Sequence, residues 1–306
     1  MVTRIISGVV GAGLLAVVLY FHDTMVLPAA VAVIIAVMLY ELLRAVKLHN
    51  CIPILAASEV CGMIMPFIYE RYYVYPEGII GGSDSRGCDG RVAVEAFAVT
   101  LLAAFVIFVT WLKKHKEIEY GQIFFVLACM VLVPQAMSTM VRIERSSRED
   151  GLFLLIMALC GAWIADTGAY FTGVAIGKHK LCPEISPKKT IEGFVGGILT
   201  TGIVYAAAFS IRGGTRLEHV SVGSVFVTGE HIGGFSMITL LAFILGIVCA
   251  VIGTVGDLSA SMVKRQIGFK DYGKIMPGHG GLMDRFDSVL FVLPVFYAFN
   301  ELIGVF

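Results

Sequence analysis

Charged side chains gather in two stretches of the C-terminal half of this sequence, and their types suit the binding of metal ions and anions. In the second stretch, Asp284 and Asp287 lie three residues apart at the start of an apolar run, so on a helix they would share one face. Asp257 ends the preceding apolar run and would approach both if the two helices were neighbours. The spacing therefore predicts a cluster of three carboxylates.

Such a cluster near hydrocarbon would repel itself unless a cation lay between its members. An ionisable residue at the centre of a spanning helix costs about 2.5–3.5 kcal/mol on insertion scales. Oxygen ligands suit a hard divalent ion, so we expect Mg²⁺, with Mn²⁺ as the alternative. Ion pairs of the aspartates with Arg285 and Lys264 are the competing explanation, and the spacing supports both equally.

A pair of lysines marks a candidate phosphate site. Lys188 and Lys189 follow Ser186 and Pro187, which are typical of a helix start with Ser as the N-cap and Pro at the first helical position. Positive side chains in the first turn of a helix are unfavourable unless an anion binds there. The pattern therefore predicts a phosphate site, and a cationic anchor at the membrane surface is the alternative.

Two single residues are further candidates. His279 lies among glycines, where the backbone amides of Gly280 and Gly281 could approach a phosphate or a base closely. Asp166 is the one charged residue of the apolar run 152–176 and could line a polar cavity. The alternatives are a structural or solvated histidine, and a hydrogen bond that Asp166 accepts from a serine or threonine of another helix.

The composition places these residues in a membrane protein. Hydrophobic residues make up 58% of the 306 residues and charged residues only 15%, against about 25% in soluble domains. Such a chain could not cover a water-exposed surface, so most of it must face lipid. The 23 basic and 23 acidic residues balance, which argues against a basic nucleic-acid-binding protein.

Apolar runs predict an all-α, polytopic membrane protein with about nine spanning helices, and eight or ten are the alternatives. The runs are 5–21, 24–43, 51–69, 92–112, 122–141, 152–176, 193–211, 235–256 and 286–305. The third is the weakest, because Pro53 and Glu59 interrupt it. With nine spans, 15 of the 23 Lys and Arg residues fall on the side of the N-terminus, which predicts that this side is cytoplasmic.

The uneven distribution of polar residues also predicts the domain organisation. We expect residues 1–150 to form structural, lipid-facing helices. Residues 151–306 would form the catalytic region, with its active-site loops in the cytoplasm.

The second polar stretch carries a recognisable motif from Ser261 to Asp287. It contains Ser261, Lys264-Arg265, Lys270-Asp271, Pro277-Gly278-His279-Gly280-Gly281 and Asp284-Arg285-Phe286-Asp287. This pattern resembles the signature of the phosphatidate cytidylyltransferases, or CDP-diacylglycerol synthases. One departure is Met276, where the family usually has Leu, Ile or Phe. The first polar stretch, with Asp166–Phe171 and Ser186–Gly193, is similar to the same family.

The resemblance implies an integral membrane enzyme that condenses CTP with phosphatidate to give CDP-diacylglycerol and pyrophosphate. It implies Mg²⁺ at Asp257, Asp284 and Asp287, and a monovalent cation such as K⁺ beside it. The lipid phosphate is already anionic at pH 7, so the chemistry needs charge neutralisation more than a general base. We expect catalytic roles for Lys264, Arg265, His279 and Arg285, and substrate contacts for Asp166, Ser186, Lys188, Lys189, Ser261, Lys270, Gly280 and Gly281.

Two other functions stay open at this point. A CTP-dependent lipid kinase of the polyprenol kinase type would share the helices, the metal and the nucleotide, but would transfer the γ-phosphoryl group. A transporter would use the charges as an ion path, but would spread them over both halves of the chain. We expect CTP, phosphatidate and membrane lipids as partners and no nucleic acid, in the plasma or inner membrane of a cell. A homodimer and a monomer are both open.

Overall fold

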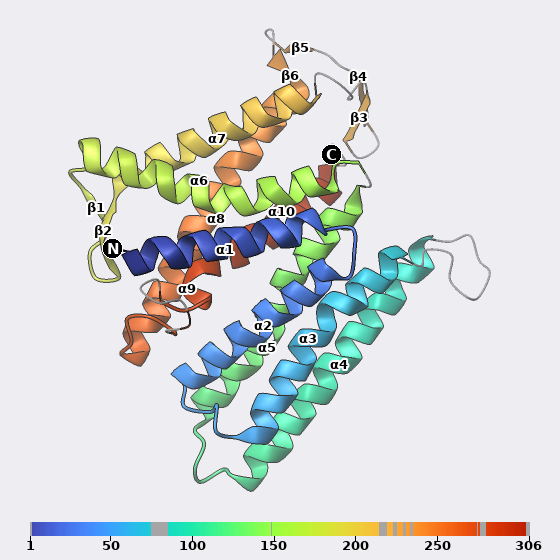
Figure 1. The fold of residues 1–306 in the computed structure, drawn as a ribbon, viewed down its shortest axis with the longest axis vertical. Coiled ribbons are helices and arrows are strands. Elements are labelled where there is room, and N and C mark those ends of the chain that lie inside the picture. The colour runs from blue at the N-terminus through green and yellow to red at the C-terminus, as the bar shows by residue number, and fades with distance from the viewer. Residues whose placement is uncertain are drawn as a thin grey trace. The chain divides into compact units, whose positions relative to one another are not determined.

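The computed structural model describes residues 2–74, 85–147, 149–213, 219–222, 225–228, 231–232, 235–273, 275 and 280–303 (Figure 1). The chain forms two compact units, and each is described by itself. The first comprises Met1–Arg148 and Ile267–Arg285, and the second comprises Glu149–Gln266 and Phe286–Phe306. The division after Arg148 lies next to the predicted boundary at residue 150, whereas the segment Ile267–Arg285 packs with the N-terminal helices.

The first unit contains five long helices: α1 (Val2–Tyr20), α2 (Val26–Ala45), α3 (Ile52–Val74), α4 (Ser85–Lys113) and α5 (Tyr120–Ser146). Figure 1 shows α2 to α5 side by side, and α3 packs against the other three. Buried apolar side chains recur every three or four residues along α2, among them Val31, Ile35 and Leu39. This periodicity is that of a helix with one face in a core, so α2 lies inside the bundle.

The second unit contains α6 (Gly151–Ile176), α7 (Ile191–Gly213), α8 (Met237–Ile267) and α10 (Val289–Ile303). Glycines allow α6 and α7 to pack closely, since a Cβ atom on Gly197 would lie 2.6 Å from the carbonyl oxygen of Ala165. Strands β1 (Lys180–Cys182) and β2 (Ser186–Thr190) form an antiparallel pair between these helices. Two smaller hairpins precede α8: β3 (His219–Val222) with β4 (Val225–Thr228), and β5 (His231–Ile232) with β6 (Phe235–Ser236).

Seven helices of the described chain, α2 to α8, are long and apolar enough to cross a membrane. Helices α1 and α10 are shorter over the described residues, but they lie in the first and last predicted runs. The predicted all-α, membrane-spanning class is therefore confirmed. Helix α3 is continuous in spite of Pro53 and Glu59, because Pro53 lies in the first turn, where its missing N–H group costs little.

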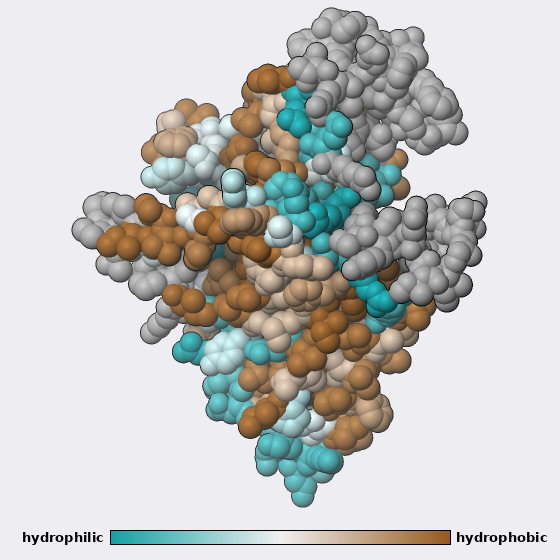
Figure 2. Space-filling model, turned by 45° about the vertical axis from the view of Figure 1, so that its right-hand side comes forward, coloured by the Kyte–Doolittle hydropathy of each residue, from teal (hydrophilic) through white to brown (hydrophobic). Residues whose placement is uncertain are grey.

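Apolar side chains also cover the outside of the helices. On α4, Phe97, Leu101 and Phe105 are exposed, although the helix packs against α3 through its other face. Figure 2 shows hydrophobic side chains over much of the visible face of the α2–α5 bundle, with hydrophilic ones at the end where α4 connects to α5. In a membrane protein such a surface is in contact with lipid, so these exposed apolar groups do not face water.

Candidate active site

In the second unit, three charged side chains from three elements meet. The ammonium group of Lys189 on β2 lies 2.5 Å from a carboxylate oxygen of Asp257 on α8 and 3.9 Å from one of Asp166 on α6. The Lys189 side chain is 23% exposed and that of Asp166 is 51% exposed, so this group faces an accessible space. The structure therefore brings together three of the residues that the sequence singles out.

A cavity of about 350 Å³ adjoins this group of charges. Its polar lining includes Asp166, Lys188 and Lys189, while Leu181 and Phe194 contribute apolar walls. Concave sites of this size with a few convergent polar groups are typical of small-ligand binding. Asp166 thus lines a cavity, as predicted, but the walls of this cavity are mainly apolar. Such a lining suits a ligand that carries both phosphate and apolar parts.

Asp287 adds a third carboxylate to the same unit. It is 7% exposed and lies in a turn before α10, where its Oδ1 accepts a hydrogen bond from the backbone N–H of Ser288 at 2.8 Å. Burial raises the pKa of the Asp287 carboxyl to about 7, and the negative charge of Asp257 adds to the rise. The positive charge of Lys264 opposes it.

Close packing of α8 against this turn explains the proximity of the two aspartates. A Cβ atom on Gly256, the residue before Asp257, would lie 2.9 Å from the carbonyl oxygen of Asp287. Two of the three predicted metal ligands are therefore electrostatic neighbours within one unit.

Two details of the predicted helices around these residues are wrong. Asp284 and Asp287 do not lie on one continuous helix, because α9 (Met283–Phe286) ends before Asp287 and α10 begins at Val289. The hydrogen bond of Asp287 to its neighbouring backbone N–H competes with helical pairing at this point. The helix of Asp257 does not end there either. It continues to Ile267, so Ser261 lies one turn further and its hydroxyl donates to Asp257 at 3.4 Å.

The predicted helix start at Ser186 and Pro187 is also wrong. Residues Ser186–Thr190 form β2, which pairs with β1 in the register Lys180 with Thr190 and Cys182 with Ser186. Helix α7 begins at Ile191, and Thr190 caps it by accepting a hydrogen bond from the backbone N–H of Gly193 at 3.1 Å. Lys188 and Lys189 consequently extend from a strand, with Lys188 exposed, and still reach the cavity.

In the first unit, Asp284 organises the signature segment. Its Oδ2 accepts hydrogen bonds from the backbone N–H groups of Tyr272 at 2.9 Å and Gly281 at 3.0 Å. Gly280 between them has φ +87°, a conformation that glycine adopts without steric cost. The Asp284 carboxylate thus links two backbone positions of the signature segment, Tyr272 and Gly281.

Glu41 on α2 contacts the same segment, and sequence reasoning missed it. This carboxylate is 1% exposed and accepts hydrogen bonds from the backbone N–H groups of Leu282 and Met283. A single acidic residue inside the apolar run 24–43 was the signal that could have found it, since an ionisable group in such a run is costly.

The other predicted site residues differ in what surrounds them. Arg265 at the end of α8 is exposed in the second unit, and Lys270 and Arg285 are exposed in the first. Lys264 is half-buried and interacts electrostatically with Asp287. His279 lies outside the described residues.

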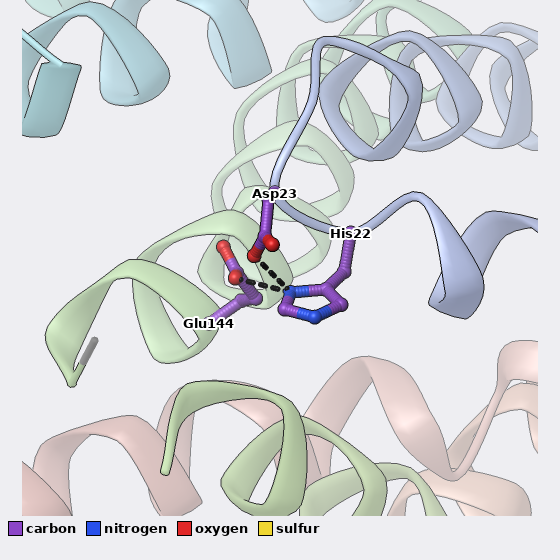
Figure 3. A group of neighbouring side chains, drawn as sticks. All are labelled: His22, Asp23 and Glu144. Atoms are coloured by element: carbon purple, nitrogen blue, oxygen red, sulfur yellow. Dashed lines mark hydrogen bonds and ion pairs between the residues drawn. The ribbon is translucent and has the colours of Figure 1, made fainter. Parts of the chain in front are cut away.

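One further cluster of charged groups in the first unit lies where the turn between α1 and α2 meets α5 (Figure 3). His22 Nδ1 lies 2.8 Å from Asp23 Oδ1 and 2.7 Å from Glu144 Oε1. Arg145 lies 3.1 Å from the other oxygen of Glu144 and forms two hydrogen bonds with Glu70. Within the described chain this is the group with the spacing of a metal site, yet the arginine already offsets its negative charge. We interpret it as an ion-pair network that joins the α1–α2 turn to α3 and α5.

Helices that cross a membrane, with aspartates and lysines beside a cavity, define an integral membrane protein whose site suits an anionic ligand. The chain belongs to the cytidylyltransferase family, whose model matches residues 2–303. A phosphatidate cytidylyltransferase of Bacillus subtilis (strain 168) is 31% identical over 266 residues, which are 86% of this chain and 84% of that protein.

Two staphylococcal relatives are more similar over a shorter stretch. The phosphatidate cytidylyltransferase of Staphylococcus saprophyticus is 42% identical over 149 residues, which are 49% of each chain. That of Staphylococcus haemolyticus is 41% identical over 150 residues, 49% of this chain and 50% of that protein. These two matches therefore span about half the length of each relative.

Proposed function

We propose that this chain is a phosphatidate cytidylyltransferase, which joins CTP and phosphatidate to give CDP-diacylglycerol and pyrophosphate. The observation that carries the proposal is the group of Asp166, Lys189 and Asp257 beside the cavity, in a chain of the cytidylyltransferase family. The family relatives that carry this enzyme name include one that matches most of the chain.

The reaction needs little from the protein besides charge and position. A phosphate oxygen of the lipid attacks the α-phosphorus of CTP, the bond between the α- and β-phosphates breaks, and pyrophosphate leaves. The attacking oxygen is already anionic at neutral pH, so no side chain has to remove a proton. Lys188 and Lys189 at the cavity would offset the phosphate charge and hold the two substrates together.

The carboxylates fit a divalent cation, for which we propose Mg²⁺, with Mn²⁺ as the alternative. Asp257 and Asp287 are oxygen donors in one unit, and the buried Asp287 has an unfavourable negative charge that a cation would stabilise. The third ligand, Asp284, is assigned from its place in the signature, three residues before Asp287. When bound, the ion would offset charge on the reacting phosphates. A monovalent cation such as K⁺ is proposed from the family resemblance.

The remaining assignments follow the signature. We assign Lys264, Arg265 and Arg285 to the transferred phosphates and His279 to positioning of the nucleotide, with further substrate contacts from Ser186, Ser261, Lys270, Gly280 and Gly281. The N-terminus and the loops of the active site would face the cytoplasm, where CTP is available. A homodimer is proposed as the assembly.

Product analysis tests this proposal. Purified protein is incubated with CTP, phosphatidate and Mg²⁺, and the lipid and nucleotide products are identified by mass spectrometry. CDP-diacylglycerol and pyrophosphate support the proposal, whereas CDP together with a newly phosphorylated lipid would establish the lipid kinase instead. Absence of both products in a correctly folded preparation would contradict either enzyme.

A further inference from the structure

We propose that Glu41 is a positioning residue that holds the signature segment around Asp284, although it belongs to the N-terminal helices. The function that it serves rests on the proposed cytidylyltransferase activity, while its structural part can be tested alone. The two elements are far apart in the sequence, since Glu41 lies on α2 and its partners, Leu282 and Met283 at the start of α9, follow it by 241 and 242 residues.

The hydrogen bonds of Glu41 use both of its carboxylate oxygens. Oε1 accepts from the backbone N–H of Leu282 at 3.1 Å, and Oε2 accepts from that of Met283 at 2.8 Å. Two adjacent backbone donors held by one carboxylate restrict both the position and the orientation of this part of the chain. Asp284 follows Met283 directly, so this contact fixes the position of the backbone from which the Asp284 side chain extends.

Two glycines of the signature make room for the Glu41 carboxylate. A Cβ atom on Gly281 would lie 2.6 Å from Oε2, and a Cβ atom on Gly273 would overlap Oε1. Any larger residue at either position would push the segment away from α2. The glycines are therefore required by the close approach of a side chain from another helix, and not only by a turn.

The contacts of Glu41 and of Asp284 interlock. Gly281 packs against Glu41 and also donates its backbone N–H to Asp284 Oδ2 at 3.0 Å. Tyr272, next to Gly273, donates to the same oxygen at 2.9 Å. Displacement of the segment from Glu41 would therefore disturb the hydrogen bonds that Asp284 accepts from Tyr272 and Gly281.

The burial of Glu41 argues against a purely incidental role. A carboxylate that is 1% exposed within a spanning helix is expensive, and an apolar residue would suit the core of α2 better. Charged acceptors form stronger hydrogen bonds to backbone N–H groups than neutral ones do. We therefore expect the hydrogen bonds from Leu282 and Met283 to offset the energetic cost of burying the Glu41 carboxylate.

The test compares Glu41→Gln with the matched control Glu59→Gln, which changes a half-buried carboxylate on α3 in the same unit. Glutamine has the shape of glutamate but only one acceptor oxygen, so one of the two backbone N–H groups loses its partner. Hydrogen exchange of peptides that cover residues 280–285 is measured by mass spectrometry in lipid nanodiscs. We expect exchange about 10-fold faster or more in Glu41→Gln, from loss of a hydrogen bond to a charged acceptor, and no change in the control.

Activity gives the second readout. We expect Glu41→Gln to lose about 10- to 100-fold in turnover and to require more Mg²⁺, as is typical when a partner of a metal ligand is removed. A purely structural role would lower the yield of folded protein and leave the Mg²⁺ dependence of the folded fraction unchanged. Glu41→Asp, which keeps the charge on a shorter side chain, should recover part of the turnover.

The exchange measurement stands even if the wild-type protein does not convert CTP and phosphatidate, so the two proposals fail separately. Unchanged exchange at residues 280–285 in a folded Glu41→Gln variant would overturn the positioning role. If that variant does not fold, Gly273→Ala displaces the same contact without removal of the charge. Normal exchange and normal Mg²⁺ dependence in Gly273→Ala would overturn the proposal as well.

Discussion

Replacement of Asp287 by asparagine separates a metal ligand from an ion-pair partner. The change is nearly isosteric and removes one negative charge from a side chain that is 7% exposed. The pKa of this carboxyl rises from its ordinary value of 3.8 to about 7, mainly because of burial. Three pH units correspond to about 4 kcal/mol against the ionised form, so a bound cation has a large charge penalty to offset.

The expected results differ between activity and stability. If Asp287 binds Mg²⁺, Asp287→Asn should insert and purify normally but lose about 100-fold or more in turnover, and added Mg²⁺ should recover only part of the loss. In EDTA the same variant should be more stable than the wild type at pH 8, because it carries no buried charge.

The sign of the pH dependence follows from the direction of the shift. The folded wild type binds the Asp287 proton more tightly than the unfolded chain, so its stability without metal falls as pH rises from about 4 to about 7. Asp287→Asn lacks this dependence, and its advantage over the wild type should shrink toward pH 4. Thermal unfolding in EDTA across this pH range, together with initial rates across a Mg²⁺ titration, measures both effects.

Asp271→Asn is the matched control, since Asp271 is exposed in the signature segment and should give a smaller metal effect. Near-normal turnover with unchanged Mg²⁺ dependence in Asp287→Asn would refute the metal role and leave an ion-pair partner of Lys264. Equal stability of the variant and the wild type in EDTA at pH 8 would refute the argument from burial.

Three further predictions address orientation, substrate and the lysines. A membrane-impermeant thiol reagent should label a Cys88-only variant in intact cells and spare a Cys182-only variant, and the reverse pattern would overturn the orientation. Diacylglycerol should not react with CTP, because a neutral hydroxyl would need a base, and its phosphorylation in a thin-layer assay would favour the kinase. Lys188→Ala should lower kcat/KM about 10- to 100-fold by loss of a charged phosphate contact, while Lys180→Ala on the neighbouring strand should stay near the wild type in the same kinetic assay.

Composition and apolar periodicity predicted the class of fold because lipid imposes one requirement on every spanning segment. Each must be long, apolar and internally hydrogen-bonded, so helices α2 to α8 follow from runs of sequence alone. The same reasoning located Asp166 and Asp257, since a charge beside hydrocarbon needs a partner, and the structure places Lys189 there.

Local sequence patterns gave wrong predictions where pairing with a distant segment determined the backbone conformation. Ser186 and Pro187 fit a helix start in isolation, but pairing of residues 186–190 with β1 moved the start of α7 to Ile191. Proline has no N–H to donate and is tolerated in an edge strand, so the same residue is compatible with both conformations. Thr190 could serve as the cap in place of Ser186, and spacing does not distinguish the two.

Glu41 shows why a motif describes only part of a site. The signature contains the backbone donors of Leu282 and Met283 and the two glycines that admit a carboxylate, but nothing within it identifies the acceptor. The acceptor, Glu41, lies in α2, whose sequence is typical of a membrane-spanning helix. Its carboxylate is the one negative charge of that helix and the feature that distinguishes it. Buried charges in apolar helices must be paired with donors somewhere in the fold. A buried charge in the N-terminal helices therefore indicates backbone donors elsewhere in the chain. For Glu41 on α2, these donors belong to the segment that contains Asp284.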